Sequence, residues 1–204
     1  MNKSKISENS QRLEDEEKID RLSVLIKDML LIINPNPSEE VLSKTPRRYA
    51  EAIWELTQTN RDSIDESIRE AIFDSEGFND MIVIRDINFN SMCEHHLLPF
   101  FGEVSIGYIP NNKILGLSKF PRLVQIISKK MSIQERLNKE IAEQIDNLLE
   151  PLGVVVMISS THSCMCFRGV KSFNSKTETL FSIGNMKLKE NLDKFFVLSR
   201  KDNK

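Results

Sequence analysis

The spacing of apolar residues divides the chain into a helical N-terminal part and a part in which strands and helices alternate. Apolar residues recur every three or four positions from Ile19 to Leu30, and Pro35 and Pro37 follow. This spacing predicts an amphipathic helix that ends before the two prolines. Residues 1–15 are polar without such spacing and are predicted to form a disordered tail.

Two further helices are predicted in the same part of the chain. Thr45-Pro46 has the pattern of a helix cap followed by proline at the first helical position. Ser63 and Glu66 have the spacing of a capping box for a third helix. Residues 16–77 are therefore expected to form a helical segment.

After residue 77 the apolar period becomes strand-like. Strands are predicted in four stretches, at residues 81–87, 101–109, 154–158 and 177–183. Two helices lie between the second and third strands, one with Pro121 in its first turn and one that Ser132 is expected to cap; another closes the domain at Leu188–Leu198. This order predicts an α+β domain with an antiparallel sheet over residues 78–200, followed by a tail, residues 201–204.

Composition and charge narrow the classes of partner. The chain has 204 residues and a formal net charge of −2, so no overall basic field favours a nucleic-acid or membrane partner. No apolar run approaches the ~20 residues that a membrane span needs. Three cysteines do not form the pattern of a secreted disulfide framework, so a cytoplasmic location is expected.

All three histidines and all three cysteines lie in two short stretches, residues 91–99 and 161–166. Cys93 and His96 have the spacing of a first pair of metal ligands, and Cys164 adds a thiolate from a distant segment. Thiolate and imidazole suit zinc, and three protein ligands leave a fourth position for water. The clustering therefore predicts an open, catalytic zinc site.

Other interpretations of these residues remain. A single cysteine or histidine is more often an ordinary buried residue, and only the clustering favours a metal. A closed structural zinc site would need a fourth protein ligand, which Cys166, His95 or His162 would provide. The spacing alone does not separate an open site from a closed one.

The second stretch also has a strand-like alternation. If residues 154–168 form one strand, then His162, Cys164, Cys166 and Arg168 share one face of it. A face with these polar and charged side chains is unlike a hydrophobic core and suits a binding site for an anionic ligand.

Five blocks of sequence follow one another in a fixed order: Ser91–Phe100, Gly107–Pro110, Gly116–Lys119, Gln134–Leu137 and His162–Gly169. Together they resemble the GTP cyclohydrolase I family, and the resemblance runs from about Leu42 through the closing helix. The family opens the imidazole ring of GTP, releases C8 as formate and recloses the product to 7,8-dihydroneopterin triphosphate. The resemblance implies this activity, the first step of folate or tetrahydrobiopterin biosynthesis.

The resemblance also implies roles for the clustered residues. Cys93, His96 and Cys164 match the ligands of one Zn²⁺ per subunit. His162 matches the residue that protonates guanine N7, and His95 matches the one that assists at the ribose ring oxygen.

The substrate contacts implied by the resemblance are scattered, because the chain has no G-x-x-x-x-G-K-[ST] phosphate loop. They comprise Ser118 near the ribose-derived chain, Glu135 at the guanine, Lys119, Arg122 and Arg168 at the triphosphate, and Gln134 as a further substrate-binding residue. Taken singly, the basic residues also suit solvated surface charges, and Ser118 and Glu135 also suit helix caps.

Several positions depart from the family pattern without touching a proposed ligand or proton carrier. They cluster around the last hairpin, where a subunit contact is expected to differ. The departures are Lys129, Lys130, Glu178, Leu180, Phe181, Asn185 and Met186.

The fold that the resemblance implies is the tunnelling fold, an antiparallel four-stranded sheet with two helices packed on it. The family usually forms a decamer with sites between subunits, which would also pair the sheet edges. Two competing functions are a non-catalytic zinc-stabilised assembly that only binds nucleotide, and a 7-deazaguanine reductase with a cysteine nucleophile and no zinc.

Overall fold

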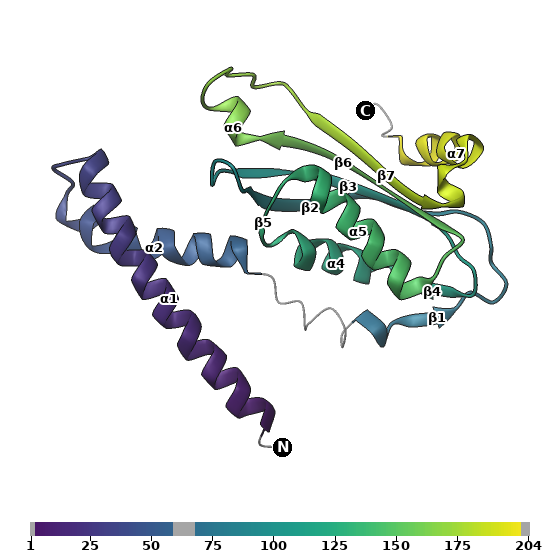
Figure 1. Ribbon diagram of the computed structural model, residues 1–204, viewed down its shortest axis with the longest axis horizontal. Helices are drawn as coiled ribbons and strands as arrows, with labels where there is room; N and C mark the ends of the chain where they lie inside the picture. The colour runs from purple at the N-terminus through teal and green to yellow at the C-terminus, as the bar shows by residue number, and fades with distance from the viewer. Residues whose placement is uncertain (1–2, 59–67, 201–204) are drawn as a thin grey trace. The chain divides into compact units, whose positions relative to one another are not determined.

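A computed structural model of the protein describes residues 3–58 and 68–200 (Figure 1). The chain forms two compact units with a boundary after Thr57. The first unit contains two helices, and the second contains the sheet, its helices and the clustered cysteines and histidines. The predicted tail 201–204 and the predicted capping box at Ser63 lie outside the described residues.

The first unit is a pair of helices, α1 (Lys3–Ile33) and α2 (Glu39–Thr57), that pack against each other. α1 ends before Pro35, as the apolar spacing predicts. It begins at Lys3, however, so residues 3–15, which were predicted to be disordered, are helical. Neither glycine nor proline occurs before Pro35, so no strong helix breaker interrupts this segment.

The start of α2 also differs from the prediction. Ser38, not Thr45, precedes the helix, and the Ser38 hydroxyl accepts a hydrogen bond from the Val41 N–H at 3.3 Å. Pro46 lies inside α2, where it removes one N–H from the helical ladder. A serine cap followed by two acidic residues in the first turn is the stronger start signal, because both satisfy the exposed N–H groups there.

The second unit is built on a sheet whose four long strands run antiparallel in the spatial order β2, β3, β6, β7. Their bounds are β2 (Ile82–Cys93), β3 (Pro99–Ile109), β6 (Gly153–His162) and β7 (Thr177–Gly184). A two-residue strand, β5 (Met131–Ser132), pairs in parallel with the end of β2. The four-stranded antiparallel sheet expected from the sequence is confirmed.

Helices cover both faces of this sheet (Figure 1). α4 (Lys119–Ser128) and α5 (Gln134–Leu149) pack on one face, and α7 (Lys189–Ser199) packs on the other. A sheet with two helices on one face, preceded by N-terminal helices, is the α+β architecture that the sequence predicts for the tunnelling fold.

The remaining elements are short. They are β1 (Ile72–Asp74), β4 (Lys113–Leu115), the single helical turn α6 (Ser163–Cys166) and the 3₁₀ turn η1 (Asn185–Lys187). Because β1 pairs antiparallel with β4, the expectation of helix up to residue 77 is wrong here. The predicted Ser132 cap is also wrong, since Ser132 pairs within β5 and α5 starts without a side-chain cap.

Alternation along β6 divides the core between the two faces. Val154, Val156 and Ile158 are fully buried in the main core with α4 and α5. A smaller core holds α7 on the opposite face, and its members are Met81, Val155, Met186 and Phe195. Gly107 permits this close approach, because a Cβ at that position would lie 2.6 Å from the Phe195 ring.

β2 contains one bulge. Its pairing passes from Ile84 opposite Ile106 to Ile87 opposite Val104, so β2 has one residue more than β3 in this interval. Asp86 adopts a left-handed φ of 61° there. Because of the extra residue, Ile84 and Ile87 both face the main core.

β6 ends at His162, and the chain turns at once into α6. The prediction that residues 154–168 form a single strand is therefore wrong. In a helix, two residues two positions apart, such as Cys164 and Cys166, point roughly 200° apart around the axis. The shared face predicted for them does not exist.

Candidate metal centre and active site

Three side chains from three segments converge into one cluster. Cys93 ends β2, His96 lies in the turn after it, and Cys164 lies in α6. One ligand atom from each lies within 4.8 Å of the others, and Cys93 Sγ is 3.7 Å from His96 Nδ1. The turn is tight because Leu97, at a φ of 52°, donates its N–H to the Cys93 carbonyl at 2.9 Å.

The donor set fits zinc, because two thiolates and one imidazole are borderline-soft ligands. Burial raises the pKa of the Cys164 thiol, and the neighbouring Cys93 thiol raises it further, while Arg168 partly opposes the shift. The protein alone thus favours the protonated thiol at Cys164. A bound divalent cation reverses this preference, because it stabilises the thiolate.

Two of the three candidates for a fourth protein ligand have other partners. Cys166 is buried, with its Sγ 3.5 Å from the Ser172 carbonyl and 4.0 Å from the Phe173 carbonyl. His162 Nε2 is engaged with Gln134. Within the described residues the cluster therefore consists of three protein ligands, which favours the open site over the closed one.

His162 lies at the end of β6, two residues before Cys164. Its ring stacks on Phe100, with the centroids 4.8 Å apart and 1° between the planes, because the two residues are paired across β3 and β6. Burial lowers the pKa of His162, and the charge of Glu135 partly opposes this shift. The imidazole is therefore fixed in its plane and favoured in the neutral form.

Gln134, the first residue of α5, lies beneath His162 and is 1% exposed. Its Nε2 has two hydrogens to donate and faces three acceptors, the Ile158 carbonyl at 3.1 Å, the Thr177 carbonyl at 3.0 Å and Thr179 Oγ1 at 3.1 Å. Its Oε1 accepts from the Ser160 hydroxyl at 2.6 Å and lies 2.8 Å from His162 Nε2. The side chain predicted to contact substrate is thus occupied by hydrogen bonds within the protein.

An ion pair ties the ligand turn to the start of α5. Arg136 donates to both carboxylate oxygens of Glu94, at 2.6 and 3.2 Å. The hydrogen bond from Arg136 lowers the pKa of Glu94. A bidentate pair fixes the plane of the guanidinium relative to the plane of the carboxylate. The turn that carries Cys93 and His96 therefore has a defined position relative to the residues that begin α5.

The family model of GTP cyclohydrolase I matches residues 22–200. The chain belongs to the GTP cyclohydrolase I family. The matched range includes every site residue predicted from the sequence, and the resemblance carried by the five blocks is thereby confirmed. The chain is therefore an enzyme that acts on GTP, as those blocks predict.

Three curated relatives have the name GTP cyclohydrolase 1. The one from Saccharomyces cerevisiae is 40% identical over 91% of this chain and 76% of its own length. The one from Porphyromonas gingivalis is 44% identical over 82% of this chain and 86% of its own length. The one from Homo sapiens is 43% identical over 84% of this chain and 68% of its own length. This chain thus spans most of each relative.

Among solved structures, the chain is similar to a crystal structure of archaeosine synthase QueF-Like in the apo form. The match has a TM-score of 0.44 and 19% sequence identity, and it covers 52% of this chain and 94% of that one.

The other predicted residues of this GTP cyclohydrolase I family member lie at element ends. His95 is exposed in the ligand turn, and its ring centroid is 6.4 Å from that of His96. Glu135 is exposed in the first turn of α5. The candidates for the ribose-derived chain and triphosphate lie at the start of α4 and after α6; they are Ser118, Lys119, Arg122 and Arg168.

Contacts join only part of the predicted site. The three ligand atoms lie together, and a hydrogen bond joins His162 to Gln134. Charge couples Glu135 to His162 and Arg168 to Cys164. Ser118 makes no side-chain cap, so its interpretation as a helix cap is not supported. Phe100 and Ser160 contact His162 and Gln134, and the sequence did not predict these contacts because they depend on the strand register.

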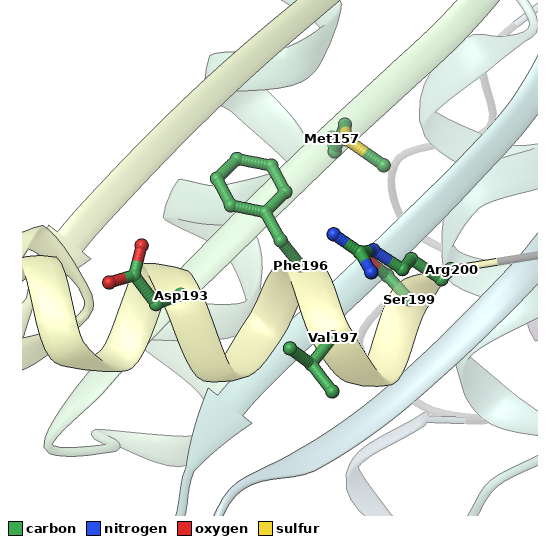
Figure 2. Close-up of a pocket in the computed structure, with 6 residues that line it drawn as sticks. All are labelled: Met157, Asp193, Phe196, Val197, Ser199 and Arg200. Carbon is green, nitrogen blue, oxygen red and sulfur yellow. The ribbon is translucent and has the colours of Figure 1, made fainter.

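A surface pocket of about 590 Å³ lies elsewhere in the second unit, between α7 and β6 (Figure 2). Its lining residues are Met157, Asp193, Phe196, Val197, Ser199 and Arg200. None of them is a predicted site residue. Met157 and His162 occupy positions of opposite parity in β6 and so face opposite sides of the sheet, which separates this pocket from the metal cluster.

Proposed function

We propose that the chain catalyses the zinc-dependent opening of the GTP imidazole ring at C8, release of formate and closure to 7,8-dihydroneopterin triphosphate. The observation that carries this proposal is the cluster of Cys93, His96 and Cys164, with a partly buried histidine of fixed orientation, His162, two residues before Cys164 in the chain. Zinc held by these residues lowers the pKa of water that it binds, and so supplies a nucleophile near neutral pH.

Two histidines handle protons in this proposal. His162 gives a proton to guanine N7, which makes C8 electrophilic, and takes it back later. His95 assists at the ribose ring oxygen; it is exposed in the same turn as the ligand His96. Histidine suits both tasks, because its two forms exchange near neutral pH.

Guanine recognition falls to Glu135, whose carboxylate accepts from the guanine N1–H and 2-amino group. Its exposed position at the start of α5, close enough to His162 to influence it, supports this role. Gln134 belongs behind His162, because its buried amide has no group left for the base.

The triphosphate is bound by basic side chains from separate elements. Arg168 lies near Cys164, and a guanidinium binds phosphate oxygens in pairs. Lys119 and Arg122 lie in the first turn of α4, with Ser118 just before it at the ribose-derived chain.

We further propose a homo-oligomer, in the family's decameric form, with the sites between subunits. β7 has β6 as its one neighbour in the sheet of the described residues, so its outer edge is free to pair. The departures Glu178 and Leu180 lie on this strand and are exposed, so they would modify that contact. The fully buried Met186 belongs instead to the core under α7.

The reaction belongs in a reducing cytosol, where thiols keep their metal. In residues 3–58 and 68–200 no helix combines the length and apolar character that crossing a bilayer requires. The product would feed folate or tetrahydrobiopterin synthesis.

The test is to incubate the purified protein with GTP, quantify formate, and measure the neopterin fluorophore after oxidation. One formate per neopterin, with zinc bound at one per chain, is the expected result. Zinc without formate release would instead identify a nucleotide-binding assembly, and turnover without zinc would remove the metal from the mechanism. Cys166→Ser is the matched control for Cys164→Ser, and only the latter should lose zinc.

A further inference from the structure

The hydrogen bonds around Gln134 determine the orientation of its side-chain amide. Nε2 lies 3.1 Å from the Ile158 carbonyl and 3.0 Å from the Thr177 carbonyl, and both groups only accept. Turning the amide over would place Oε1 against these two oxygens, and acceptors that face one another repel. Nε2 therefore points to the backbone of β6 and β7, and Oε1 points to Ser160 and His162.

This orientation decides which nitrogen of His162 carries a hydrogen. Gln134 Oε1 can only accept, and it lies 2.8 Å from His162 Nε2, so Nε2 is the donor. In the neutral imidazole the lone pair is then on Nδ1. The stacked Phe100 ring fixes the plane of the imidazole, and the hydrogen bond fixes which edge faces Gln134.

We propose that Gln134 is a positioning residue that holds His162 in the Nε2–H tautomer, so that Nδ1 is the atom that exchanges the proton with guanine. The inference rests on the proposed function, in which His162 protonates N7. Nδ1 first takes a proton from solvent, so that the ring becomes the imidazolium; this hydrogen then moves to N7, the electron pair of the N–H bond stays on Nδ1, and the ring returns to the Nε2–H tautomer. The other hydrogen stays on Nε2 throughout and remains hydrogen-bonded to Gln134 Oε1.

A buried position distinguishes this role from substrate binding. Gln134→Met removes the acceptor at similar length and is expected to lower kcat by about 10- to 100-fold, the scale of an orienting partner of a functional histidine. The KM for GTP should stay unchanged, because no contact with substrate is lost. A raised KM with unchanged kcat would make Gln134 a substrate contact and overturn the proposal.

The tautomer itself can be observed without turnover. The chain has three histidines, so protein purified with its metal and labelled with ¹⁵N-histidine gives three imidazole patterns, and His162→Gln assigns one. The unaltered protein should show hydrogen on Nε2 alone, and Gln134→Met should show both tautomers. Hydrogen on Nδ1 in the unaltered protein would overturn the proposal, even if Gln134→Met does not fold.

Asn138→Leu is the matched control. Asn138 is buried one turn further along α5 and donates to the same Thr179 Oγ1, at 2.9 Å, without contacting His162. Asn138→Leu should leave kcat and the tautomer unchanged. If it lowers kcat as much as Gln134→Met does, the effect of Gln134→Met comes from a loosened α5 and the proposal is overturned. If the unaltered protein releases no formate from GTP, the proposed function fails, while the nitrogen spectrum still decides the Gln134 assignment.

Discussion

Arg47 in the N-terminal unit forms ion pairs with Glu16, Asp20 and Glu51 at an exposed surface, whereas Gln134 in the second unit is buried with every polar atom hydrogen-bonded. The carboxylates raise the pKa of Arg47, yet exposed pairs contribute little to stability because water and salt screen them. A buried amide that loses a partner is costly, because nothing replaces it. Substitution should therefore be tolerated better at Arg47 than at Gln134.

Apolar side chains show the same contrast. In α1, Leu25 is 65% exposed and Ile32 81% exposed, whereas Phe195 of α7 is fully buried. Two helices with few buried residues depend largely on propensity and local contacts. The predicted site therefore lies on the unit with the larger core, where buried residues such as Phe100 and Gln134 support the partly exposed side chains of the site.

The largest effect is expected from a substitution that removes a ligand from the metal cluster. His96→Ala should lose zinc and all measurable turnover, because a ligand is gone. His162→Ala should keep zinc and lose ring opening by roughly 10²-fold or more, the scale of a missing general acid. Zinc content and formate release measure both. Equal zinc loss in the two variants would mean that their roles are misassigned.

A smaller effect separates the parts of the ligand. Arg168→Ala should weaken GTP binding by about 10- to 100-fold, because it removes charged hydrogen bonds to phosphate, and should leave guanosine binding unchanged. Glu135→Gln should weaken both ligands, since an amide can present N–H to N–H. Calorimetry with GTP and guanosine tests this. Similar losses of both ligands in Arg168→Ala would place Arg168 outside the phosphate site.

A pair of truncations compares the packing of the two units. Phe195→Ala should cost about 3–5 kcal/mol in the free energy of unfolding, because it empties the core under α7. Leu25→Ala should change it by no more than about 0.5 kcal/mol, the usual effect at an exposed site. Chemical denaturation measures both. A cost at Leu25 matching that at Phe195 would show that α1 is covered in solution.

The smallest effect concerns the helix start found at Ser38. Ser38→Ala should destabilise the N-terminal unit by about 0.5–2 kcal/mol through loss of the cap, with turnover unchanged. Ser43→Ala is the control in the same helix: its hydroxyl bonds back to the Glu40 carbonyl at 3.2 Å, and alanine favours a helix interior. A larger cost at Ser43 would contradict the assigned start.

The ligands were predictable because cysteine and histidine are rare here and gather in two stretches. The four strands were predictable from β-branched runs. The end of β6 was not, because alternation continues through Cys166, while the turn depends on hydrogen bonds such as Phe167 N–H to the Ser163 carbonyl at 3.0 Å. The role of Gln134 was not predictable either, because its partners on β6 and β7 are 24 to 45 positions away in sequence.

The bulge in β2 sets the parity of the rest of that strand. Without its extra residue, alternation would turn Met92 toward the main core and Cys93 toward the side of α7. A thioether would then stand where the cluster needs a thiolate. The direction of the Cys93 side chain thus depends on the one extra residue of the bulge at Asp86. Asp86 is exposed and lies about 20 Å along the strand from Cys93.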